Sequence, residues 1–106
     1  MAKYLAIASY TAEGMKGLMA GGGSARVEAS RQVVAEAGGT LESFYFAFGK
    51  DDAYVVADLP DNVAAAAVAM AVAASGLVVT RMVTLLTPEE IDHAAARTLP
   101  YQAPGG

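Results

Sequence analysis

The apolar residues of this chain follow two periodicities, and each predicts a type of element. Runs rich in β-branched and aromatic residues predict four strands, at 3–10, 41–48, 53–58 and 77–86. Apolar positions at helical spacing predict three helices, at 24–37, 62–75 and 88–97, and a weaker one at 12–20 that Gly14 and Gly17 disfavour. The order β-α-β-β-α-β plus a C-terminal helix predicts a ferredoxin-like α+β fold with a four-stranded antiparallel sheet.

Polar residues mark the expected starts of the helices. Thr11, Ser24 and Asp61 each precede a helical stretch, and their side-chain oxygens can accept hydrogen bonds from free backbone N–H groups. The run 87–90, Thr-Pro-Glu-Glu, is a capping box with proline at the first helical position. Gly21–Gly23 lacks the spacing of a phosphate-binding loop, so we interpret it as a helix break. We expect a single domain over 1–99 and an irregular tail over 100–106.

The strand at 41–48 predicts that both faces of the sheet are buried. Its side chains alternate between two sets, Phe44, Phe46 and Phe48 on one face and Leu41, Tyr45 and Ala47 on the other. In a ferredoxin-like fold the helices cover one face only, and a soluble monomer rarely exposes an apolar patch of three phenylalanines. We therefore expect two subunits to pack sheet to sheet as a dimeric α/β barrel.

The helix at 62–75 contains no charged residue and so lacks an ordinary solvated face. We expect its sheet-facing stripe to contain Val63, Ala67, Met70 and Ala74, with Val68 and Val72 on another stripe. A neighbouring subunit's helix or the C-terminal tail would cover that second stripe, which predicts an assembly larger than a dimer. The uncharged run at 62–80 is interpreted as helix then strand rather than a membrane span, because it is mostly alanine and Ser75-Gly76 divides it.

Composition and charge narrow the function classes. The chain is 55% hydrophobic with 24 alanines and only 17% charged residues, which excludes intrinsic disorder. A net charge of −4 opposes binding to nucleic acid or an anionic membrane. The absence of cysteine excludes disulfides, thiolate metal sites and a thiol nucleophile. No export signal precedes the first strand, so a cytoplasmic location is expected.

Four stretches of the chain resemble the GYD domain family, and together they span nearly its whole length: 4–14 (YLAIASYTAEG), 39–49 (GTLESFYFAFG), 58–67 (DLPDNVAAAA) and 85–90 (LLTPEE). The resemblance implies a ferredoxin-like fold and self-association. The motif that names the family would be Gly-x-Tyr-Asp, whereas this chain has Gly49-Lys50-Asp51-Asp52, so only Gly49 and Asp52 carry over. The wider structural relatives include monooxygenases, isomerases, haem-degrading proteins and ligand-sensing domains, and fold alone does not choose among them.

A few side chains are candidates for binding or chemistry. Tyr10 and Tyr45 are strand tyrosines, and Lys16 lies in the glycine-rich segment where we expect a ligand to enter between sheet and helices. Arg81 lies within a strand, where a long cationic side chain needs a partner. We favour an ion pair with a residue such as Glu42 or Asp58, and the alternative is that Arg81 binds an anionic or carbonyl group of a ligand. His93 is interpreted as a surface residue.

Taken together, these features of the sequence predict a homo-oligomer that binds a small molecule or has a role in assembly. We expect no metal and no cofactor. The alternative is a cofactor-independent enzyme, of monooxygenase or isomerase type, acting on an aromatic or carbonyl metabolite. In it Arg81 would orient the substrate while Tyr10, Tyr45 or His93 moves a proton. A purely structural role is a third class.

Overall fold

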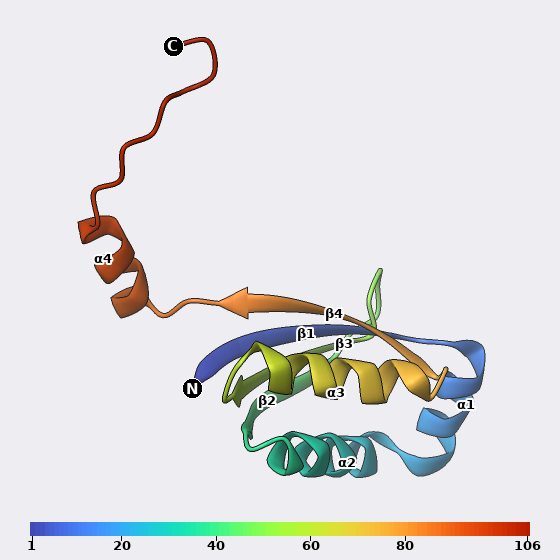
Figure 1. The fold of residues 1–106 in the computed structure, drawn as a ribbon. Helices are drawn as coiled ribbons and strands as arrows, with labels where there is room; N and C mark the ends of the chain where they lie inside the picture. The colour runs from blue at the N-terminus through green and yellow to red at the C-terminus, as the bar shows by residue number, and fades with distance from the viewer.

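The computed structural model describes all residues, 1–106, and contains one open sheet with four helices (Figure 1). The elements in chain order are β1 Ala2–Tyr10, α1 Ala12–Gly21, α2 Gly23–Glu36, β2 Thr40–Phe46, β3 Ala53–Leu59, α3 Asn62–Ala74, β4 Val78–Leu85 and α4 Pro88–Ala96. The strands lie in the order β2-β3-β1-β4, and every neighbouring pair is antiparallel. This topology confirms the predicted ferredoxin-like α+β fold.

Side-chain caps start three of the helices as the sequence predicts. The Thr11 hydroxyl accepts a hydrogen bond from the Gly14 amide at 3.2 Å, and an Asp61 carboxylate oxygen accepts from the Ala64 amide at 2.9 Å. Both bonds of the capping box at Thr87 are formed. The expected cap at Ser24 is wrong: the cap is Gly22, two residues earlier, and its φ of 85° suits a residue without a Cβ.

A β-bulge in β2 corrects the predicted alternation. The register shifts between Leu41 and Ser43, so Leu41 pairs with Ala57 and lies on the same face as Phe44. Phe46 shares that face, with its ring 4.9 Å from that of Phe44. Phe48 lies beyond the end of the strand and is fully exposed. The phenylalanines therefore do not make up the uncovered face, contrary to the expectation from strict alternation.

The core lies between the sheet and the layer formed by α2 and α3. Its buried residues come from three strands and both helices: Tyr4, Val34, Leu41, Ala57, Leu59, Ala65 and Val68. The stripe predicted for α3 is wrong, because Val68 is buried while Val63 and Met70 are 78% and 71% exposed. The sheet-facing stripe is Ala65, Val68 and Val72, and an uncharged stripe faces outward.

Besides the outward stripe of α3, two surfaces with exposed apolar side chains remain uncovered. Both α2 and α3 lie on one side of the sheet, so its other side, here called the bare face, carries no helix (Figure 1). The register places residues of all four strands on the bare face, among them Leu5, Ile7, Ser9, Tyr45, Tyr54, Val56, Val79, Arg81, Val83 and Leu85. The second surface is α4, which stands away from the sheet with all of its residues exposed. None of the helices is both long and apolar enough to cross a bilayer.

Candidate functional site

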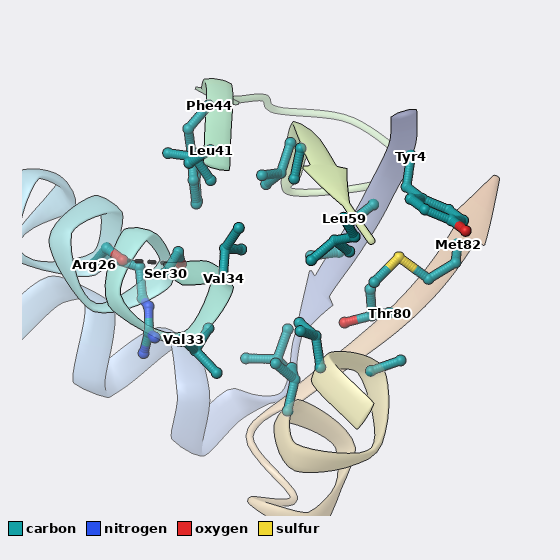
Figure 2. Close-up of a pocket in the computed structure, with 18 of the residues that line it drawn as sticks. Tyr4, Arg26, Ser30, Val33, Val34, Leu41, Phe44, Leu59, Thr80 and Met82 are labelled. Carbon is teal, nitrogen blue, oxygen red and sulfur yellow. Dashed lines mark hydrogen bonds between the residues drawn. The ribbon is translucent and has the colours of Figure 1, made fainter. Parts of the chain in front are cut away.

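A pocket of about 90 Å³ lies between the helix-covered face of the sheet and the helices α2 and α3 (Figure 2). Sixteen of its nineteen lining residues are hydrophobic, and the three polar ones are Arg26, Ser30 and Thr80. The strands contribute alternate residues, because every second side chain of a strand points to the same face. From α2, Ser30 and Val33 face the pocket one turn apart. The pocket is therefore mainly apolar, with only a few polar side chains in its lining.

One end of this pocket adjoins a second hollow of about 230 Å³ that glycines of α1 line. Tyr10, Arg26 and Val78 line both spaces, so Tyr10 and Arg26 lie where the two meet. In Figure 2 the guanidinium of Arg26 lies at the edge of the lining residues, on the side away from Tyr4 and Met82. The apolar pocket thus has one cationic end.

The phenol of Tyr10 is neutral at physiological pH. Its burial raises its pKa above the ordinary value of 10.0, the positive charge of Arg26 opposes this increase, and the negative charge of Asp52 adds to it. A neutral phenol keeps its proton and can donate a hydrogen bond. Tyr10 therefore offers a donor beside the Arg26 cation.

Arg26 differs from the other basic side chains of the chain. Four of the seven form ion pairs with carboxylates: Lys3, Lys16, Arg31 and Arg81. Lys50 and Arg97 have no such partner but are exposed to solvent. Arg26 is the one basic residue that is partly shielded from solvent and lacks a carboxylate partner. Charge that is withdrawn from water without a counterion is energetically costly, so this guanidinium is suited to an anion from outside the chain.

The turn between β2 and β3 is tied to the end of β1 by its two aspartates. The Asp52 carboxylate accepts a hydrogen bond from the Tyr10 amide at 2.8 Å, and the Asp52 amide donates to the Ala8 carbonyl at 2.8 Å. Asp51 accepts from the Ser9 hydroxyl at 3.2 Å and pairs with Arg81 at 3.4 Å. The Asp52 carboxylate therefore holds the backbone of Tyr10, which lies beside Arg26 at the cationic end of the pocket.

We expect Asp52→Ala to lower the free energy of unfolding by about 1.5–3 kcal/mol, the usual contribution of a hydrogen bond to a charged acceptor. Chemical denaturation measures this loss, and Asp52→Asn should recover part of it because the amide oxygen still accepts. The control is Lys50→Ala, two residues earlier, whose exposed side chain has no bonded partner. Equal stabilities for the two alanine variants would contradict the role assigned to Asp52.

The structure separates the side chains that the sequence singled out. Tyr10 lines the pocket, whereas Tyr45 and Arg81 lie on the bare face. Lys16 is exposed and pairs with Glu13 at 3.3 Å along α1. His93 is exposed on α4, and no three His, Cys, Asp or Glu side chains come together as metal ligands. Gly49 lies in the exposed turn with open space around it.

Sequence reasoning missed Arg26. The spacing of Arg26, Ser30 and Val33 places it on the inward-facing stripe of α2, and this spacing was the signal available. Because Glu28, Arg31 and Gln32 of the same helix are also polar, Arg26 resembles one more residue of a solvent-exposed helix face.

Comparison with known proteins gives one family match. The family model described as GYD domain matches residues 4–95. No curated protein and no solved structure matches the chain significantly. The match covers nearly all of the sheet, the first three helices and nearly all of α4.

Proposed function

The chain belongs to the GYD domain family, and from this premise we propose that it is a self-associating domain that binds a small, mainly apolar molecule between its sheet and its helices. The observation that carries the proposal is the apolar pocket. Protein interiors are normally close-packed, with few voids larger than a water molecule. Here a space of about 90 Å³ remains between α2, α3 and the strands.

The chemistry of the lining supports binding of an apolar group. Water in a cavity needs two to four polar partners, and most of the residues that line this pocket are alanine, valine or leucine. An engineered apolar cavity of about 150 Å³ accepts benzene. This pocket is smaller, about 90 Å³, but it adjoins the second hollow of about 230 Å³, and the two spaces together suit a ligand with a small ring or a short chain. A binding role is favoured over turnover because Tyr45, Arg81 and His93 lie outside the pocket.

The bare face supports self-association. Leu5 pairs across the sheet with Val56 on one side and Val83 on the other, and Ile7 pairs with Tyr54. This apolar centre lies between three ion pairs, those of Lys3 with Glu42 and Asp58 at one end and that of Arg81 with Asp51 at the other. An apolar centre with a polar rim is typical of a protein interface, and a second copy packed sheet to sheet would cover it.

The C-terminal arm, residues 86–106, supports the same proposal. Its apolar side chains Leu86, Ile91, Leu99 and Tyr101 are each at least half exposed. A nine-residue helix is marginal in water on its own, so α4 needs a surface to pack on. Another copy is the proposed surface, and the outward stripe of α3, with Val63 and Met70, offers an apolar area for it.

Native mass spectrometry of the purified protein tests both halves of the proposal. We expect a dimer or a larger closed assembly, with retained mass from a small molecule. Ala69→Leu fills the pocket and should abolish the retained mass, whereas Ala67→Leu, the same change on the outward side of α3, should keep it. A monomer would overturn self-association, and retained mass unaffected by Ala69→Leu would overturn binding in this pocket.

A further inference from the structure

We infer that the ligand of this pocket is an apolar monocarboxylate, whose ring or chain lies among the strand and helix side chains while its carboxylate is bound by Arg26 and Tyr10. The inference rests on the proposed function, because it names the class of molecule that the pocket takes.

The single cation at one end of the pocket requires one negative charge. Arg26 is partly shielded and has no carboxylate partner within the chain, unlike Arg31 five residues later on the same helix, which pairs with Glu28 at 3.5 Å. A guanidinium presents two parallel N–H donors that match the two oxygens of a carboxylate. No second basic side chain lines either space, so a doubly charged phosphate would remain only half neutralised.

Tyr10 adds a neutral donor beside the cation. It lines both spaces together with Arg26, and the charge of Arg26 acts on its phenol. The hydrogen bond to Asp52 is donated by the Tyr10 amide and not by its hydroxyl, so the phenol proton is available to a ligand. The remaining lining is apolar, so a polar tail or a second charge would lose its hydration without gaining a partner.

Paired probes test the inference in the full-length protein. Sodium benzoate and benzyl alcohol share a ring and differ in charge, as do hexanoate and hexan-1-ol. We expect binding of both members of each pair in protein-observed NMR titrations, with the carboxylate bound about tenfold or more tightly. Arg26→Gln should weaken carboxylate binding by about tenfold to a hundredfold and leave alcohol binding unchanged. Arg31→Gln removes the same charge from the same helix and should change neither.

The pKa of Tyr10 gives a readout that a merely structural role would not change. The charges acting on its phenol are those of Arg26 on α2 and Asp52 in the β2–β3 turn. A bound carboxylate adds a negative charge nearby, so saturating benzoate should raise the pKa of Tyr10 further, and benzyl alcohol should not. Tyrosine-ring carbon NMR over an alkaline pH range measures this shift.

The possible results distinguish this inference from the proposed function. Equal affinities for carboxylates and alcohols, or equal losses in Arg26→Gln and Arg31→Gln, would overturn the carboxylate inference while binding in the pocket stands. Absence of binding by all four probes would overturn the carboxylate inference. If the native protein also retains no small molecule, the binding half of the proposed function fails with it.

Discussion

Leu5→Glu should convert the assembled protein into monomers. Leu5 lies at the centre of the bare face, between Val56 and Val83 on the neighbouring strands. A carboxylate buried there without a partner costs about 3–5 kcal/mol, and a symmetric interface would contain two of them. The dissociation constant should therefore rise by at least about a hundredfold. Sedimentation velocity over a range of protein concentrations measures it.

The control for this variant is Ala35→Glu, which makes the same change of charge on the exposed side of α2, on the opposite side of the sheet. It should assemble like the unmodified protein. Because assembly stabilises the folded state by mass action, the thermal midpoint of the unmodified protein should rise with concentration, and that of Leu5→Glu should not. If Leu5→Glu remains folded and assembled, the bare face is not the interface.

The fold was predictable because its signals are local. The strand runs, the caps at Thr11 and Asp61 and the capping box at Thr87 each depend on residues a few positions apart, and the structure has all of them. The facing of side chains was less predictable. The bulge at Glu42 adds one residue to β2, and this extra residue reverses the face of every side chain on one side of the bulge. No residue type in the sequence predicts such a bulge.

The orientation of helix α3 on the sheet was also difficult to predict from the sequence. Eight of its thirteen residues are alanine, and without a polar side the sequence contains nothing that orients the helix on the sheet. The stripe that faces inward depends on which side chains fit the surface of β3 and β4, which is a property of packing.

The candidate site was harder to predict than the fold because its parts meet only in three dimensions. Tyr10 was identified as a tyrosine in a strand, but its association with Arg26 depends on how α2 lies across the sheet. The bond from the Tyr10 amide to Asp52 joins residues 42 positions apart and uses a backbone donor that no sequence pattern marks. The expected type of partner for Arg81, a carboxylate, is correct, but the partner is Asp51. The register places Arg81 beside Ile7, whereas Glu42 and Asp58 lie with Lys3 at the other end of the sheet.

Gly14→Ala should destabilise the domain, while Gly17→Ala, one turn later in the same helix, should stabilise it. A Cβ on Gly14 would lie 2.0 Å from the Leu77 carbonyl oxygen and 2.9 Å from the carbonyl carbon. These atoms belong to the backbone before β4 and cannot rotate away as a side chain would. The same oxygen accepts a hydrogen bond from the Thr11 amide at 2.9 Å, so moving it also disturbs the start of α1. Overpacking of this kind costs about 1–3 kcal/mol or more.

A Cβ on Gly17 meets nothing within 4 Å, so this position measures helix propensity alone. Replacing glycine by alanine in a helix interior stabilises by about 1 kcal/mol. The two variants should therefore differ by about 2–4 kcal/mol in the free energy of unfolding, with opposite signs relative to the unmodified protein. Chemical denaturation under identical conditions measures both. Equal stability of Gly14→Ala and the unmodified protein would mean that α1 does not lie this close to Leu77. Destabilisation by both would mean that the segment containing Gly17 is not a regular helix, and the second hollow beside Arg26 would then have a different wall.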